Sequence, residues 1–248
     1  MSRNFELLKR AEREQELLGV SAPVVVPVPT NGRRRLPNDE SAIREEALKL
    51  VQRVFLLPSA EGRRAVVFCD VDAGKGSSWV SARAAEALAG QVEGSVCLVD
   101  ANLRSPRLHK HFGVSSDRGL SDALLDTGPI RNFARRLLGA NLWLVVCGSG
   151  AADSLAVLKP DRLQSRLAEL RAEFDYVLID APPVRLYTDA LLVGQSTDGV
   201  VLVVEANSTR REAAHRAKMI LEAANVKLLG AVLNNRTFPI PESIYRRL

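Results

Sequence analysis

The 248-residue sequence is poor in cysteine, in aromatic residues and in long apolar runs. Its three cysteines show no C-x-x-C spacing and form no ligand set with the three histidines, so a structural metal site is not expected. No apolar run approaches the roughly 18–20 residues that a membrane helix needs, and no signal-peptide pattern opens the chain. With 16 glycines and 12 prolines, a fibrous repeat is excluded. We therefore expect a globular cytoplasmic protein without direct membrane insertion.

Positive charge is in slight excess, because 34 Lys and Arg outnumber 29 Asp and Glu to give a formal net charge of +5. A nucleic-acid-binding domain would concentrate such an excess on one face and interleave it with aromatic residues. Aromatic residues make up only 5% of this chain, and its one true basic cluster, Arg33–Arg35, lies in a proline-rich stretch. A nucleic-acid partner is therefore not expected.

The first 40 residues differ in pattern from the rest of the chain. Residues 2–18 carry an apolar stripe at helical spacing, which predicts a helix. Residues 20–40 contain repeated prolines, which are incompatible with a helix interior and cannot donate into a sheet, so an extended linker is expected. A second helix is predicted over residues 41–56. The chain is thus divided into a helix and linker over 1–40 and one domain over 41–248.

From residue 64 onward, short β-branched runs alternate with helical patterns. Nearly continuous apolarity indicates strands that are covered on both faces, as in a parallel sheet. This alternation predicts a doubly wound α/β fold with a mostly parallel sheet and an N-terminal helical extension. Ligands of such sheets bind beyond the carboxyl ends of the strands. The predicted strands cover residues 65–68, 96–99, 142–146, 176–179, 200–204 and 228–233.

The loop after the first strand contains glycine and serine and precedes an alanine-rich helix. Backbone N–H groups and the dipole of such a helix can cradle a phosphate group. When the P-loop pattern G-x-x-x-x-G-K-[ST] is aligned on Gly76, Ser77 takes the lysine position and Ser78 keeps the hydroxyl that would hold Mg²⁺. Lys75 either reaches the phosphates or is a solvated lysine at the crest of the loop. Gly74, Lys75, Gly76, Ser77 and Ser78 are the candidate nucleotide-binding residues of this loop.

Three further strand tips carry polar side chains. Asp100 can orient Mg²⁺-bound water or accept a proton from a hydroxyl, or it can instead cap the next helix. Asp180 is placed to hold the water shell of a metal ion. Asn234 can read an adenine edge or satisfy a turn. Together the tips favour a nucleotide site, with Ser78, Asp100 and Asp180 as candidate Mg²⁺ ligands.

Residues 98–106 resemble the Walker A′ motif of bacterial tyrosine kinases, an apolar run followed by D-x-D-x-R. Residues 177–183 resemble their Walker B motif, and residues 119–122 and 188–191 resemble other stretches common in that family. The resemblance extends over residues 41–236. The order of the motifs along the chain makes it far more specific than any one motif.

The resemblance implies a MinD/ParA-like P-loop fold that uses ATP and Mg²⁺ in capsule and exopolysaccharide synthesis and export. It implies catalytic positions for Asp100, Asn102 and Arg104, and a phosphoacceptor at Tyr245. The implied partner is a membrane-embedded polysaccharide chain-length regulator, or co-polymerase, and self-association of subunits is implied as well. The sequence is similar to the separate cytoplasmic subunits of the family, with recruitment to the inner face of the membrane by the partner.

Four departures from the family pattern bear on activity. Ser77 stands at the position of the phosphate-binding lysine, and Asn102 stands at the second aspartate of the A′ motif. The terminal tyrosine cluster is reduced to Tyr245, and the oligomerisation motif E-x-x-R-x-x-R is represented only by residues 46–52. Phosphoryl transfer depends on offsetting charge at the β- and γ-phosphates, and a serine offsets none. Nucleotide binding and phosphotransfer are therefore expected to be weak or absent.

Two other functions are compatible with parts of the sequence. A positioning ATPase of the MinD/ParA type would carry a signature lysine near the start of the loop, where this chain has Asp72. A non-enzymatic adaptor would dock on the co-polymerase through residues 2–18, although that helix could equally fold back on its own domain. The favoured function is a tyrosine-kinase-like regulator of exopolysaccharide synthesis.

Overall fold

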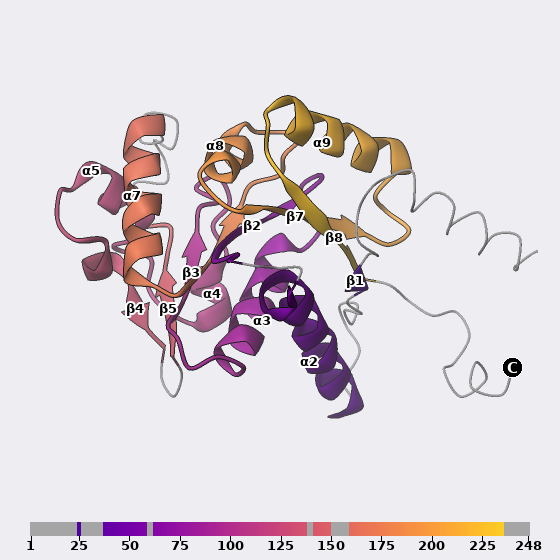
Figure 1. Ribbon diagram of the computed structural model, residues 1–248, viewed down its shortest axis with the longest axis horizontal. Coiled ribbons are helices and arrows are strands. Elements are labelled where there is room, and N and C mark those ends of the chain that lie inside the picture. The colour runs from indigo at the N-terminus through magenta and orange to yellow at the C-terminus, as the bar shows by residue number, and fades with distance from the viewer. Residues whose placement is uncertain (1–23, 26–36, 59–61, 138–140, 150–158, 236–248) are drawn as a thin grey trace, which may run out of the picture.

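The computed structural model describes residues 24–25, 37–58, 62–137, 141–149 and 159–235. In these ranges a twisted sheet is covered by helices on both faces (Figure 1). The strands are β1 (Val24–Val25), β2 (Ala65–Asp70), β3 (Val96–Asp100), β4 (Arg135–Arg136), β5 (Leu142–Val145), β6 (Tyr176–Ala181), β7 (Gly199–Glu205) and β8 (Leu228–Asn234). Their order across the sheet is β1-β8-β7-β2-β6-β3-β5-β4.

All neighbouring strands run parallel except β4, which is antiparallel to β5. The helices are α2 (Pro37–Val51), α3 (Ser77–Ala89), α4 (Leu108–Phe112), α5 (Leu120–Leu125), α7 (Pro160–Glu173), α8 (Asp189–Gln195) and α9 (Arg211–Ala223), with a π-helical turn over Gln52–Leu56 and a 3₁₀ turn over Ile130–Phe133. The predicted α/β class and mostly parallel sheet are therefore confirmed.

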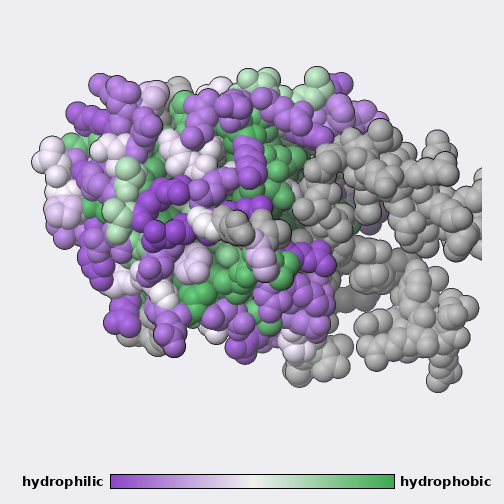
Figure 2. Space-filling model, in the orientation of Figure 1, coloured by the Kyte–Doolittle hydropathy of each residue, from purple (hydrophilic) through white to green (hydrophobic). Residues whose placement is uncertain are grey.

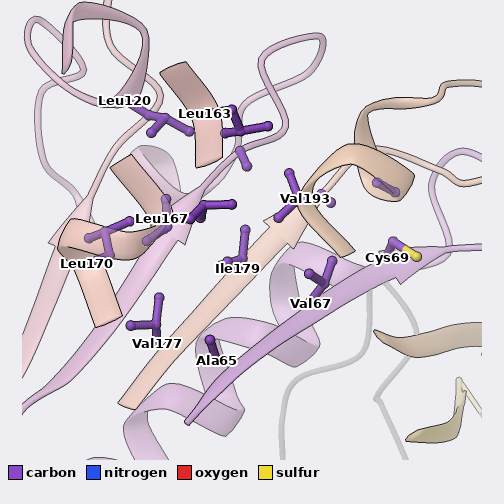
Figure 3. Packing of buried hydrophobic residues seen from close by; sticks show 14 of the residues in the cluster. Ala65, Val67, Cys69, Leu120, Leu163, Leu167, Leu170, Val177, Ile179 and Val193 are labelled. Atoms are coloured by element: carbon purple, nitrogen blue, oxygen red, sulfur yellow. The ribbon is translucent and has the colours of Figure 1, made fainter. Parts of the chain in front are cut away.

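The sheet separates two hydrophobic layers, because successive strand residues point to opposite faces. On one face, side chains of β2 and β6 pack against α7 and α8, as Figure 3 shows. This layer includes Ala65, Val67, Cys69, Val177, Ile179, Leu163, Leu167, Leu170 and Val193. On the other face, Val66 and Phe68 pack with α2 and α3. The outer surface in the view of Figure 2 is mainly hydrophilic. The central strands are thus held rigidly, and their carboxyl ends are fixed relative to one another.

The structure differs from the sequence prediction at both edges of the sheet. Within the expected linker, Val24–Val25 pairs in parallel with β8. Helix α2 begins at Pro37, four residues before the predicted start, and continues as the π-helical turn to Leu56. The short strand β4 was not predicted, since two adjacent arginines carry no strand signal. The helix predicted over residues 2–18 lies outside the described residues.

Candidate nucleotide site

The loop between β2 and α3 leaves the sheet at Asp70 and enters the helix at Ser77. Gly74 and Gly76 adopt positive φ values of +78° and +104°, which residues other than glycine rarely adopt. A Cβ atom on Gly76 would lie 2.2 Å from Nδ2 of Asn234. The loop therefore needs glycine at Gly76 both for its backbone conformation and for a close approach from β8.

Asn234, the last residue of β8, holds this loop from the outside. Its Nδ2 donates a hydrogen bond of 2.7 Å to the carbonyl oxygen of Lys75. The side chain is 2% exposed, and its Oδ1 has no hydrogen-bond partner among the described residues. The Asn234 amide thus contacts the loop between β2 and α3, and its reading of an adenine edge stays a prediction.

Lys75 points its ammonium group at the end of β7. Its Nζ lies 2.9 Å from Oε2 of Glu205 and 2.6 Å from Oγ of Ser208. The lysine side chain is only 17% exposed, so it is not a solvated crest residue. The ion pair also lowers the pKa of Glu205. As arranged, this cation is paired with a carboxylate of its own chain.

Asp70 occupies the inner side of the loop. Its Oδ1 accepts a hydrogen bond of 2.9 Å from the Ser77 amide, and its Oδ2 accepts one of 3.1 Å from the Lys75 amide. The residue is 6% exposed, and burial raises its pKa to about 6 although the loop amides oppose the rise. Sequence reasoning missed Asp70. The signal that could have found it is its position, because it ends a buried strand as Asp100 does.

Asp180 lies on the adjacent strand β6, in register with Phe68 of β2 and with Asp100 of β3. It is fully buried, and neither carboxylate oxygen has a hydrogen-bond partner among the described residues. Burial, and then the charge of Asp100, raise its pKa well above the ordinary value, and the nearby hydroxyls of Ser78 and Ser77 offset part of the rise. A buried carboxylate without donors is the arrangement that a cation or its water shell would stabilise.

Asp100 caps the helix that follows it. Its Oδ2 accepts hydrogen bonds of 3.1 Å from the amides of Arg107 and Leu108, and its Oδ1 accepts one of 3.3 Å from the Asn102 amide. Burial raises its pKa against the effect of these bonds. The capping role, one of the two considered from the sequence, is therefore present. It does not prevent a metal contact, since Oδ1 accepts only one hydrogen bond from the described residues and keeps a second lone pair.

Asn102 and Arg104 are both held by contacts within the chain. Oδ1 of Asn102 accepts a hydrogen bond of 3.1 Å from the Ser105 amide and so closes a turn. Arg104 makes a two-point contact with Asp189, at 3.0 and 3.2 Å, and its guanidinium carbon lies 4.2 Å from the centre of the Tyr187 ring. The Arg104 side chain is thus fixed beside the N-terminus of α8.

A cavity of about 270 Å³ brings most of these residues together. Among its lining residues are Asp70, Gly74, Gly76, Ser77, Ser78, Asn102, Arg104 and Tyr187. Asp100 and Asp180 are fully buried and do not line it, nor do Lys75 and Asn234. A larger groove of about 500 Å³ lies between α2 and α3 but is lined by none of the strand-tip residues. The candidate site is therefore the cavity at the carboxyl ends of β2 and β3.

The residues present fit Mg²⁺ better than they fit a triphosphate. Mg²⁺ keeps several waters and takes one or two carboxylates. Asp180, which does not itself line the cavity, would supply a carboxylate, and Ser78 would supply a hydroxyl. Among the described residues, no group of three or more His, Cys, Asp or Glu side chains forms a ready-made metal cluster. A triphosphate meets a loop whose Lys75 and Ser77 amides already donate to Asp70. It also meets a serine where a P-loop has lysine.

A parallel sheet with a glycine-bearing loop between β2 and α3, and with aspartates at neighbouring strand ends, defines a P-loop NTPase fold of the MinD/ParA type. Solved structures agree. A MinD protein of Pyrococcus horikoshii, solved with Mg-ADP, superposes with a TM-score of 0.60 at 23% identity, over 74% of this chain and 76% of that one. The chimerical protein CapA2B2 gives a TM-score of 0.78 at 23% identity, over 92% and 99%.

Sequence comparisons identify the family. The family model of the cellulose biosynthesis protein BcsQ matches residues 64–228. The tyrosine-protein kinase YwqD of Bacillus subtilis is 30% identical over 173 residues, which are 70% of this chain and 73% of the relative. The putative tyrosine-protein kinase EpsB of Ralstonia nicotianae is 31% identical over 202 residues, and this match spans 26% of its length. The chain belongs to the bacterial tyrosine-kinase family of capsular and exopolysaccharide synthesis, with its MinD/ParA-like fold.

None of the helices in the part of the chain that the structure describes is long and apolar enough to cross a membrane. The candidate phosphoacceptor Tyr245 lies outside the described residues.

Proposed function

We propose that the chain is a tyrosine-kinase-like regulator of exopolysaccharide or capsule synthesis and export, in which nucleotide binding and phosphotransfer are impaired. The family supports the pathway. The observation that carries the impairment is the loop: Ser77 stands at the lysine position, and the ammonium group of Lys75 is paired with Glu205. A loop without this cation leaves the charge of the β- and γ-phosphates unbalanced.

The remaining site residues support a weak metal-dependent function. Asp180 and Ser78 are the groups that would hold Mg²⁺, and Mg²⁺ would supply positive charge opposite phosphate oxygens. Asp100 keeps the strand tip in place by capping α4, and Arg104 is anchored on Asp189. These contacts give the chain a stable scaffold whether or not nucleotide is present, which suits a protein that acts by binding a partner.

The proposed partner is a membrane-embedded chain-length regulator, or polysaccharide co-polymerase, which would recruit this cytoplasmic chain to the inner face of the membrane. The large remainder of EpsB beyond the matched region supports a further domain working beside this one in that relative. Self-association of the chain is part of the proposal. A non-enzymatic adaptor would dock through residues 2–18, which lie outside the described residues.

A MinD/ParA-type ATPase switch receives less support. At the signature-lysine position, Asp72 makes a two-point contact with Arg185 at 2.7 and 2.9 Å. A lysine at this position would reach the phosphates of a partner subunit. Asp72 is acidic and already paired within its own chain, so it cannot take that role.

The test is titration of the chain with Mg-ATP by calorimetry, for the wild type and for Ser77→Lys. We expect no saturable binding by the wild type at millimolar nucleotide, and measurable binding by Ser77→Lys, because one charge-stabilising donor is worth on the order of 10²-fold. Gln52→Lys, which adds the same charge at an exposed position on another element, is the matched control and should behave as the wild type does.

Phosphotransfer is followed in parallel by radiolabel on Tyr245 after incubation with Mg-ATP. We expect little or no label on the wild type. Strong autophosphorylation that disappears in Asp100→Asn would overturn the proposed impairment.

A further inference from the structure

The inner side of the loop between β2 and α3 is filled by a side chain of the strand that leads into it. Asp70 spans the loop and accepts hydrogen bonds from the amides of Lys75 and Ser77, at 3.1 and 2.9 Å. In a P-loop these are the amides that point at the phosphates of a bound nucleotide. The carboxylate therefore meets the donors that a phosphate oxygen would meet.

The same loop segment is fixed on its other sides by contacts that involve no ligand. The carbonyl oxygen of Lys75 accepts from Asn234, and the Lys75 ammonium group is paired with Glu205 and Ser208. Gly76 sits against the Asn234 amide so closely that it leaves no room for a Cβ atom. The loop is thus held on its inner side by Asp70 and on its outer side by Asn234 and Glu205.

We propose that Asp70 is a built-in anion that takes the phosphate position of this loop, so that the chain keeps a ligand-bound loop shape without nucleotide and excludes polyphosphates. The inference rests on the proposed function, because it explains how the site of that function is closed. Its physical basis is competition: two amides that donate to a buried carboxylate cannot donate to a phosphate at the same time.

Electrostatics adds to the competition. Asp70, Asp100 and Asp180 are all buried at the ends of adjacent strands, and Ser77 supplies no compensating charge. An entering polyphosphate would bring further negative charge and would have to strip Asp70 of its two donors. A lysine introduced at Ser77 would first meet the Asp70 carboxylate. A lysine at position 77 is therefore not sufficient for tight nucleotide binding while the Asp70 carboxylate occupies the loop amides.

The test compares Ser77→Lys with the double variant Asp70→Ser/Ser77→Lys, by calorimetry with Mg-ATP and with inorganic pyrophosphate. We expect the double variant to bind each probe at least about 10-fold more tightly, because the apparent affinity is reduced in proportion to the fraction of molecules whose loop is open, and removing Asp70 raises that fraction. No difference between the two proteins would overturn the inference.

The matched control is Asp72→Ser/Ser77→Lys. It removes the same charge from the same loop, but Asp72 is paired with Arg185 instead of with the loop amides. We expect this control to bind within about 2-fold of Ser77→Lys, because the Asp72 carboxylate is paired with Arg185 and the competition for the loop amides by Asp70 is left in place. An equal gain in both double variants would overturn the inference in favour of simple charge repulsion.

A second measurement needs no variant that binds nucleotide. In the nucleotide-free wild type, the amides of Lys75 and Ser77 should be protected from hydrogen exchange, about 10-fold or more relative to Asp70→Ser. Wild-type amides that exchange as freely as open loop amides would overturn the inference even if Asp70→Ser failed to fold. Autophosphorylation of the wild type would instead overturn the proposed function, so the two failures have different readouts.

Discussion

Gly76 is the point where the loop, Asn234 and helix α3 meet, and replacing it by alanine tests that packing. The residue has φ +104°, and a Cβ atom there would lie 2.2 Å from Nδ2 of Asn234. Gly74, two residues earlier, also has a positive φ, +78°, but nothing lies within 4 Å of its Cβ position. Gly74→Ala therefore reports backbone strain alone, and Gly76→Ala reports strain together with a steric clash.

The two costs can be estimated separately. An alanine in the left-handed region costs about 1–2 kcal/mol, which is the whole expected effect of Gly74→Ala. At Gly76 the Asn234 amide must also move away from the Lys75 carbonyl oxygen, which forfeits a hydrogen bond worth about 0.5–1.5 kcal/mol. We therefore expect Gly76→Ala to lower the free energy of unfolding by about 1.5–3.5 kcal/mol.

Urea unfolding followed by circular dichroism measures both variants, together with Asn234→Ala and the double variant Gly76→Ala/Asn234→Ala. Because Asn234→Ala removes the obstacle, the double variant should be more stable than the sum of the single losses predicts, by about 1 kcal/mol. Equal losses for Gly74→Ala and Gly76→Ala, or strict additivity in the double variant, would refute the described packing.

Two further predictions concern buried and paired carboxylates. Asp180→Asn should stabilise the chain at pH 7 in Mg²⁺-free buffer by about 1–2 kcal/mol, because burial and Asp100 raise the pKa of Asp180. A raised pKa makes stability fall as pH rises above the value in the unfolded chain, so the variant should show a flatter pH dependence in urea unfolding, and an unchanged slope would contradict this reasoning. Asp198→Asn should destabilise the chain at pH 7 by about 1–3 kcal/mol. Burial raises the pKa of Asp198, but two backbone amides at the start of β2 and the Arg171 guanidinium outweigh burial and lower it. Its contribution is present above about pH 4 and is lost below it, so thermal melts of wild type and variant should converge toward pH 3.

The strands could be predicted because their apolar runs are nearly continuous, and buried parallel strands have no polar face to interrupt the pattern. The ends of the strands were harder to predict. The prediction over 65–68 stops before Asp70, whereas the strand continues to that residue, and Asp100 and Asp180 likewise lie inside their strands. A polar side chain at a strand tip ends the hydrophobic pattern but not the backbone pairing, so the predicted strands stop one or two residues before these aspartates.

The two outermost strands could not be predicted for a different reason. Val24–Val25 and Arg135–Arg136 are each two residues long. Two residues give no periodicity, and their pairing is decided by a neighbouring strand that is distant in sequence, β8 in one case and β5 in the other. Tertiary context, which the local sequence does not contain, therefore sets both edges of the sheet.

At the candidate site, residue type alone does not predict what each side chain contacts. Three aspartates lie at or next to the ends of neighbouring buried strands, and the structure gives each a different set of donors. Asp100 accepts from the amides that open α4, Asp70 accepts from the amides of the loop, and Asp180 accepts from none. A buried carboxylate whose oxygens have donors is stabilised within the chain, whereas one without them needs a proton or a cation. Of the three, Asp180 is therefore the residue at which a metal ion would change the energy of the folded chain most, and Asp70 is the one that a phosphate would have to displace.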